Sequence, residues 1–277
     1  VKVLTGTRVE SFEGNGKVNA VVTSQGKLPA DTVILAIGVR PRVKLAQEAG
    51  LEIGTTGAIK VDQHMCTSDP DIYAAGDCVE CMDLLTSQPC FVPLGSTANK
   101  QGRVAANSIC DVDDAFPGVL GSTVCKVFDY VVARTGLTET AANRLDYAVV
   151  TALVPAPDKA HFMPTAKPLL LKLVVDKASR RLLGAQATGP GAGDKRIDVA
   201  AMAITAGMTV DQLANADLCD APSHASAMDN IITAANVARD KLDGTMLGVS
   251  SVEVHRMMDG GIAMWPFEKP RFTPSAS

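Results

Sequence analysis

One segment of the chain constrains the fold more than any other. Val33-Ile34-Leu35-Ala36-Ile37 is apolar at every position and ends at Gly38. A strand with apolar side chains on both faces is typical of the centre of an α/β sheet that is covered on both sides. We therefore predict a central strand here. Val1-Lys2-Val3-Leu4 also indicates the inside of a strand, so we expect the sequence to continue a longer chain.

Two turn signals precede this apolar segment and predict a β-meander. They are Glu13-Gly14-Asn15-Gly16 and Gln25-Gly26, on either side of the apolar residues 18–23. A short helix is expected over residues 43–49, and Gly50 is placed to end it.

A second strand and a long helix are expected further along the chain. Residues 72–75 predict a short strand that ends on Gly76-Asp77. The helix is expected after residue 95, with Ser96 or Thr97 as its N-cap. Small residues at helical spacing predict a buried stripe that lets another backbone approach closely. These residues are Ala98, Gly102, Ala105 and Ile109.

The pattern changes after Gly121, where segments typical of strands come first and helical patterns follow. This order predicts an α+β domain. Thr209 and Gln212 predict a capping box, with Met208 and Leu213 placed as a hydrophobic staple. The predicted strands are residues 122–128, 147–154, 169–175 and 182–187, and the predicted helices are residues 194–206, 209–216 and 225–241.

Composition and charge exclude several classes of protein. A hydrophobic content of 47% with 20% charged residues excludes a mainly disordered chain, and 277 residues suffice for about two domains. A net charge of −4 argues against electrostatic binding of nucleic acid. The sequence has neither an apolar run of membrane-spanning length nor a secretory signal at its start. We expect a cytoplasmic protein without nucleic-acid or membrane partners.

Seven scattered cysteines predict reduced thiols rather than a disulfide scaffold. Cys78 and Cys81 have the spacing of a redox pair or of two zinc ligands. No second pair at such spacing supplies the remaining ligands that zinc needs. We therefore predict no metal ligands, and a redox or zinc role for this pair stays the weaker interpretation.

The most informative motif runs from Thr67 to Asp77, with the sequence TSDPDIYAAGD. An acidic side chain just beyond a buried strand lies where open α/β sheets bind ligands. The glycine before it lets a ligand approach the backbone, and the carboxylate can accept hydrogen bonds from sugar-type hydroxyl groups. The alternative is that Gly76-Asp77 forms an ordinary turn.

This motif resembles the second FAD fingerprint of the pyridine nucleotide–disulfide oxidoreductases. Residues 35–41 resemble the segment that closes the NAD(P)H domain of that family. Residues 92–103 resemble the flavin-facing loop and helix of its CoA-disulfide reductases and NADH oxidases. The resemblance extends from Val1 to about Gly244. Segments similar to the C-terminal dimerisation domain of the family are residues 126–129, 135–139 and 194–198.

The resemblance implies an α/β remnant of FAD/NAD(P)-binding domains, followed by an α+β dimerisation domain. It also implies electron transfer from NAD(P)H through FAD to a disulfide, polysulfide or oxygen. A homodimer is implied, with Ile197, Ala201, Ile204 and the helix over residues 225–241 at its interface. The implied domains are 1–45, the end of the NAD(P)-binding domain; 46–118, the end of the FAD-binding domain; 119–244, the dimerisation domain; and 245–277, a tail.

By the same resemblance, Asp77 binds the ribityl chain of FAD and the backbone of residues 94–98 faces the flavin ring. The N-terminus of a helix carries a positive partial charge that would favour the anionic reduced flavin. An ordinary core helix is compatible with the same residues. The implied cofactor-binding residues are Gly38, Gly76, Asp77, Leu94, Gly95, Ser96, Thr97 and Ala98.

Some features depart from the pattern of the family. No G-x-G-x-x-G fingerprint is present, so the chain needs an upstream FAD/NAD(P)H half as a partner and has no catalytic residue to assign. Asp220 stands where CoA-disulfide reductases have a tyrosine, which argues against CoA disulfide as the substrate. His224 is an alternative acid/base, because histidine is a residue type suited to proton transfer near neutral pH. Residues 250–255 resemble the start of a rhodanese-like domain. The alternative function is a non-catalytic dimerisation or interaction fragment.

Overall fold

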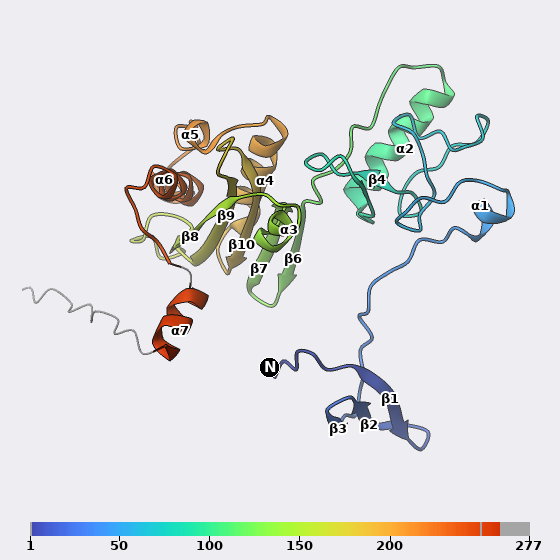
Figure 1. Cartoon of the computed structure of the whole chain (residues 1–277), viewed down its shortest axis with the longest axis horizontal. Coiled ribbons are helices and arrows are strands. Elements are labelled where there is room, and N and C mark those ends of the chain that lie inside the picture. The colour runs from blue at the N-terminus through green and yellow to red at the C-terminus, as the bar shows by residue number, and fades with distance from the viewer. Residues whose placement is uncertain (1, 250, 261–277) are drawn as a thin grey trace, which may run out of the picture. The chain divides into compact units, whose positions relative to one another are not determined.

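The computed structural model describes residues 2–249 and 251–260 (Figure 1). The contacts within the chain divide it after Arg42 into two compact units. Each unit is described separately below.

The first unit contains the predicted β-meander. Its strands are β1 (Val9–Gly14), β2 (Val18–Thr23) and β3 (Gly26–Pro29), which pair antiparallel in sequence order. Gly14 lies at φ +153°, and a Cβ at this position would lie 1.9 Å from the carbonyl oxygen of Lys17. The first turn therefore requires glycine at residue 14.

The predicted central strand over residues 33–37 is not formed. Ile34 is 86% exposed and Ile37 is 90% exposed, and neither these residues nor Lys2–Leu4 belong to a strand. A buried central strand needs neighbouring strands to pair with and helices to cover it. The part of this unit that the structure describes supplies only the meander, so the apolar pattern has nothing to pair with.

The second unit begins with a region of short elements over residues 43–120. They are α1 (Lys44–Glu48), β4 (Cys81–Met82), β5 (Pro89–Cys90) and α2 (Gly95–Ile109). The helix predicted over 43–49 is confirmed, and Gly50 follows it at φ +76°. The predicted strand over residues 72–75 is wrong, because only an isolated antiparallel bridge between Cys66 and Tyr73 forms there.

Helix α2 differs from its prediction in two respects. Its N-cap is Leu94, whose side chain cannot accept a hydrogen bond, so the predicted Ser96 or Thr97 cap is wrong. Of the predicted stripe, Ala105 is buried and Ala98 is partly buried, whereas Gly102 and Ile109 are exposed. Tertiary contacts decide which face is buried, because α2 packs against Met65, Cys81 and Phe116. The buried residues of α2 are Thr97, Gln101, Val104 and Ala105.

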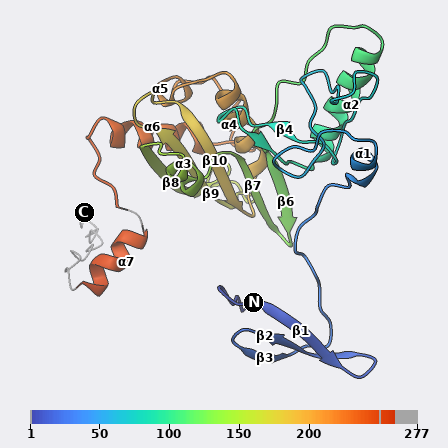
Figure 2. The ribbon, with the colours of Figure 1, turned by 45° about the vertical axis from the view of Figure 1, so that its right-hand side comes forward.

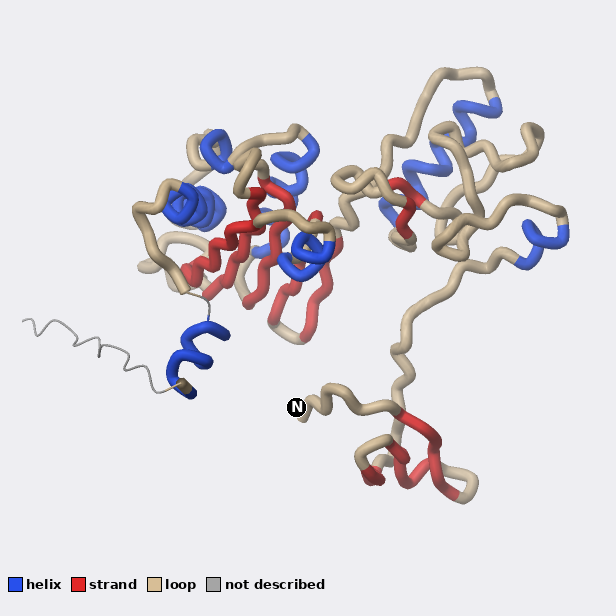
Figure 3. Tube along the Cα trace, viewed as in Figure 1, coloured by secondary structure: helices blue, strands red, loops and turns tan. Residues whose placement is uncertain are grey.

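The rest of the second unit contains a five-stranded antiparallel sheet in the order β6-β7-β10-β9-β8 (Figure 3). The four predicted strands are confirmed, and β7 was not predicted. The bounds are β6 (Thr123–Val127), β7 (Tyr130–Gly136), β8 (Val149–Pro157), β9 (Pro168–Asp176) and β10 (Leu182–Gly189).

The two long helices of this domain cover one face of the sheet. Helix α4 (Gly193–Thr205) packs on β7 and β10, and α6 (Asn230–Leu242) packs on β8 and β9. Alternate residues of β9, including Leu171 and Leu173, point into the core on this face. Val174 lies in a second cluster with Ala142 of the unpredicted helix α3 (Glu139–Arg144). Figure 2 shows the strands side by side in another view.

The three predicted helices are confirmed, α4 with nearly the predicted bounds and the other two as shorter helices. Helix α6 begins at Asn230 rather than at 225, because the Asp229 side chain accepts a hydrogen bond from the N–H of Ile231 and caps it. Helix α5 (Val210–Leu213) has the predicted capping box between Thr209 and Gln212. The unpredicted helix α7 (Ser251–Asp259) lies in the segment expected to be a tail. Among the described residues, none of the helices is both long and apolar enough to span a membrane.

The predicted dimer-interface residues lie in different environments. Ile197 and Ile204 are buried in the core of the sheet and its helices, so they cannot contact a second copy. Ala201 is partly buried, and the next residue, Met202, is 68% exposed. On α4, it is therefore the outer side with Met202 that is available to a partner.

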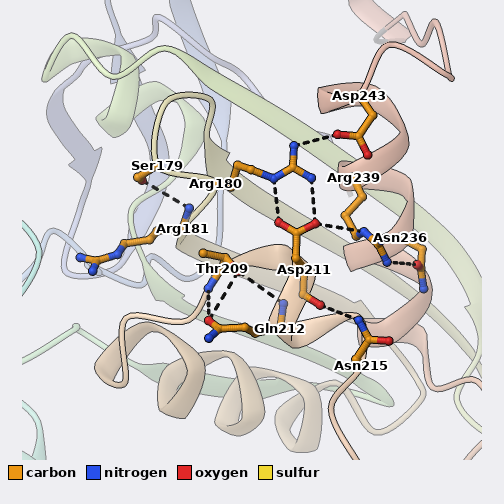
Figure 4. Close-up of polar contacts among 10 residues, drawn as sticks. All are labelled: Ser179, Arg180, Arg181, Thr209, Asp211, Gln212, Asn215, Asn236, Arg239 and Asp243. Atoms are coloured by element: carbon orange, nitrogen blue, oxygen red, sulfur yellow. Dashed lines mark hydrogen bonds and ion pairs between the residues drawn. The ribbon is translucent and has the colours of Figure 1, made fainter.

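Two polar networks join the elements of the sheet domain. Arg196 on α4 is 1% exposed and pairs with Asp229, with its Nη2 2.8 Å from Oδ2. Arg180, in the turn between β9 and β10, donates two hydrogen bonds to Asp211 and one to Asp243 (Figure 4). The first pair joins α4 to the start of α6, and the second joins α5 and the end of α6 to the β9–β10 turn.

Candidate functional site

The Gly76-Asp77 turn lies beside helix α2. Gly76 adopts φ +92°, where residues with a Cβ are strained, and an added Cβ would lie 3.7 Å from the Cβ of Ala98. The N–H of Val79 donates to the Gly76 carbonyl at 3.2 Å and closes the turn. The structure therefore brings two predicted cofactor-binding segments together, because Gly76 adjoins the first turns of α2.

Asp77 presents its carboxylate to solvent. The residue is exposed, and its side chain makes no hydrogen bond or ion pair with any other residue that the structure describes. Most acidic residues nearby are engaged in local contacts; for example, Asp62 accepts from the N–H groups of His64 and Cys66. The Asp77 carboxylate is thus free to accept hydrogen bonds from a ligand.

The first turn of α2 offers unpaired hydrogen-bond donors. The first helical hydrogen bond runs from the Ala98 N–H to the Leu94 carbonyl at 2.9 Å, and no side chain caps the helix. The N–H groups of Gly95, Ser96 and Thr97 precede that bond, so they point along the helix axis without a helical partner. Together with the helix dipole, these donors favour an anionic or electron-rich group.

Gln101 is a functional candidate that was missed in the sequence. Its side chain is completely buried and its Oε1 accepts a hydrogen bond from the Gly76 N–H at 2.9 Å. A glutamine in a helix is ordinarily expected to face solvent. The buried face of α2 was therefore assigned to the small residues and not to Gln101. The available signal was its helical spacing from Thr97 and Val104, which places all three on one face.

Gly38 lies in the first unit, where it is exposed at φ +91°. The contacts that define the turn and the helix start come from the second unit alone. Leu94 is partly buried and Thr97 is buried, so these two contribute backbone and packing rather than exposed side chains.

The cysteines near the site have separate partners. The Cys78 thiol donates to the Ala75 carbonyl, and Cys81 accepts from Gln101. Burial raises the pKa of the Cys78 and Cys81 thiols, and burial beside Cys81 raises the pKa of Cys90 to about 12. Within the described residues, no group of three or more His, Cys, Asp or Glu side chains could hold a metal ion. These thiols are protonated at neutral pH and poorly nucleophilic.

His224 lies in an exposed loop of the sheet domain. Its Nδ1 is 2.8 Å from the Oγ of Ser223, and Asp220 nearby is also exposed. An acid/base role for His224 stays a prediction, because this contact by itself does not identify a substrate.

Comparisons with known proteins agree with this architecture. The profile of the pyridine nucleotide–disulphide oxidoreductases matches residues 1–102, and the profile of their dimerisation domain matches residues 122–232. The CoA-dependent NAD(P)H sulfur oxidoreductase of Pyrococcus furiosus is 42% identical over 229 residues, which are 83% of this chain and 52% of that protein.

Two solved structures resemble the chain closely. An NAD-dependent persulfide reductase from A. fulgidus has a TM-score of 0.86 at 48% identity, over 90% of this chain and 46% of the other. A FAD-dependent pyridine nucleotide–disulphide oxidoreductase from Desulfovibrio vulgaris has a TM-score of 0.72 at 41% identity, over 86% of this chain and 56% of the other.

A mixed α/β region followed by an α+β dimerisation domain defines a class of nucleotide-dependent oxidoreductases, and the predicted fold class is confirmed. The chain belongs to the pyridine nucleotide–disulphide oxidoreductase family. It spans about half the length of the curated relatives that it matches.

Proposed function

We propose that this chain is the C-terminal portion of a flavoprotein that passes electrons from NAD(P)H through FAD to a sulfur acceptor. The observation that carries this proposal is the exposed, unpaired Asp77 carboxylate beside the uncapped start of α2. In this assignment residues 1–45 end the NAD(P)-binding domain and residues 46–118 end the FAD-binding domain. Residues 119–244 are the dimerisation domain, and residues 245–277 follow it.

The donors and acceptors at the site suit FAD. A carboxylate without a protein partner can accept from ribityl hydroxyl groups, and free helix N–H groups can donate to the electron-rich edge of the ring. When bound, FAD would supply the two-electron relay between the nicotinamide and the acceptor. The chain itself would hold and orient the cofactor through Gly76, Asp77 and residues 94–98, with the remaining contacts from the upstream half.

A disulfide, persulfide or polysulfide is the acceptor class that we favour. Two of the similar proteins are named as a sulfur oxidoreductase and a persulfide reductase. Oxygen is the competing acceptor, because NADH oxidases are also among the relatives. Anaerobic assay of the holoenzyme with NAD(P)H and inorganic polysulfide tests this choice. Oxidation of NAD(P)H that requires oxygen and ignores polysulfide would contradict it.

The first experiment is the visible absorption spectrum of the protein purified together with its upstream half, with the intact mass of the same sample. We expect a flavin spectrum that NAD(P)H bleaches. The Asp77→Ala variant should lose FAD affinity by about tenfold or more, because a charge-assisted hydrogen bond is removed. The matched control is Asp71→Ala, an exposed aspartate of the same motif. A colourless sample of the full chain would leave the non-catalytic fragment as the better assignment.

We also propose a cytoplasmic homodimer that uses the outer side of α4. Its support is the dimerisation-domain match and the exposure of Met202 on a helix whose other side is buried. The Met202→Glu variant should shift the mass measured by light scattering from dimer to monomer. Leu153→Glu places the same charge on an exposed strand residue and should leave the dimer intact. A monomeric wild type would overturn the proposal.

A further inference from the structure

Gln101 is the only side chain of α2 that bonds the Gly76-Asp77 turn among the described contacts. Its Oε1 accepts from the Gly76 N–H at 2.9 Å, and its Nε2 donates to the Cys81 Sγ at 3.2 Å. Cys81 belongs to β4. One buried side chain therefore joins the turn, the helix and the β4–β5 hairpin.

The orientation of this amide follows from its partners. A backbone N–H can only donate, so the Gln101 atom that faces Gly76 must be the oxygen. The nitrogen then faces the sulfur of Cys81, which accepts weakly. The two contacts are complementary, and each one favours the same orientation of the amide.

The position of the turn depends on this contact because few alternatives exist. Gly76 has no side chain, and its φ of +92° is one that residues with a Cβ rarely adopt. A buried backbone N–H that loses its acceptor is costly, so the turn would move to find another. The Asp77 carboxylate, one residue further on, would move with it.

We infer that Gln101 is a positioning residue that holds the Gly76-Asp77 turn against the start of α2. Its role toward the cofactor rests on the function proposed above. In such an enzyme, Gln101 positions the Asp77 carboxylate without contacting the flavin. A methionine of similar length cannot replace it, because methionine offers Gly76 only a weak acceptor and Cys81 no donor.

The test compares Gln101→Met with Val104→Ala in the full chain. Val104 is equally buried on the same face of α2, but its apolar side chain cannot accept a hydrogen bond from Gly76. Exchange of the Gly76 amide hydrogen is followed by NMR, with the amide of Ala105, a buried residue of α2, as the reference for opening of the region over residues 43–120. Gln101→Met should raise Gly76 exchange about tenfold or more relative to Ala105. Val104→Ala should leave this ratio within about twofold.

An unchanged ratio in Gln101→Met would overturn the inference. If that variant does not fold, Cys81→Ala removes the sulfur that accepts from the Gln101 amide, together with a small part of the packing against α2, and it should still raise the Gly76 ratio. An unchanged ratio in Cys81→Ala would then overturn it.

A measurement of FAD binding distinguishes a failure of this inference from a failure of the proposed function. Quenching of flavin fluorescence gives the FAD Kd for the wild type and both α2 variants, each assembled with the upstream half. Gln101→Met should weaken binding about tenfold, and Val104→Ala about twofold or less. A wild type that binds no FAD would count against the proposed function of this chain, whereas the Gly76 exchange ratio would still decide the role of Gln101.

Discussion

Residues 43–120 and residues 122–242 lie in the same unit but are held together differently. The first region has a few short elements joined by isolated bridges, such as those of Ile59 with Ile53 and Val79. The second has a continuous antiparallel sheet with a large core under α4 and α6. The candidate cofactor site lies in the first region, where loops and one helix end position it.

This difference shows what each region needs from outside itself. The sheet of the second region pairs all its central strands internally, so it can be stable alone. In the first region, the Ile72–Ala75 segment has strand-like residues but no ladder. Low local stability is common at ligand sites, because the ligand or a partner supplies the missing contacts.

The largest effect is expected at the buried ion pair of the sheet domain. Arg196→Leu leaves the Asp229 carboxylate buried without its guanidinium, and we expect a loss of about 3–5 kcal/mol in the free energy of unfolding. Urea denaturation measures it. The control is Lys195→Ala, because Lys195 is 3.8 Å from Asp229 and half exposed. A loss below about 1 kcal/mol in Arg196→Leu would show that the pair does not hold α4 and α6 together.

Two cavity-forming variants compare the regions directly. Leu173→Ala in β9 and Met65→Ala beside α2 each remove a fully buried side chain, and each should cost about 2–5 kcal/mol locally. Hydrogen exchange, measured by mass spectrometry at increasing urea concentrations, should show that the two regions are destabilised separately. Met65→Ala should destabilise only peptides from residues 43–120, and Leu173→Ala only those from residues 122–242. Equal shifts in both sets would mean that the two regions unfold as one.

Sequence reasoning succeeded where local pattern and tertiary partners agree. The strands β6, β8, β9 and β10 were predicted, because each is rich in apolar and β-branched residues and is bounded by polar or Pro-rich connections. The capping box at Thr209 was predicted because it depends only on residues three apart. β7 was missed, since its apolar run is short and is followed by Arg134, Thr135 and Gly136.

The failures share one physical cause, which is dependence on distant residues. The Val33–Ile37 run has strand character, but a strand forms only where a neighbour pairs with it. The buried face of α2 was assigned from its small residues, whereas the contact between Gln101 and Gly76 bridges 25 positions in the sequence. No local sequence pattern predicts such a contact. For the site, the motif predicted Gly76 and Asp77 but not the residue that holds them.

A smaller effect is expected at the cap of α5. Thr209→Ala removes the hydroxyl that accepts from the Gln212 N–H, and we expect a loss of about 1 kcal/mol by urea denaturation. Thr209→Ser keeps the acceptor and should recover most of this loss. A similar loss in both variants would mean that the threonine methyl group, rather than the cap, is responsible.

The smallest effect concerns Arg180 and depends on pH. Its guanidinium donates two hydrogen bonds to Asp211 and one to Asp243, and the three side chains are between 30% and 47% exposed. Solvent screening limits such pairs, so Arg180→Ala should cost about 1 kcal/mol or less near pH 7. Arg181→Ala is the matched control, because Figure 4 shows that side chain pointing away from the cluster.

The sign of the pH dependence follows from the carboxylate. Hydrogen bonds from Arg180 lower the pKa of Asp211 below its usual 3.8 in the folded chain. A lowered folded pKa stabilises the chain fully above the unfolded pKa, and this stabilisation is lost as the pH falls through the folded value. The difference between wild type and Arg180→Ala in urea denaturation should therefore be constant above about pH 5 and shrink below about pH 4. A difference that persists at pH 3 would mean that Arg180 stabilises the β9–β10 turn by packing rather than by charge, since packing does not depend on the ionisation of Asp211.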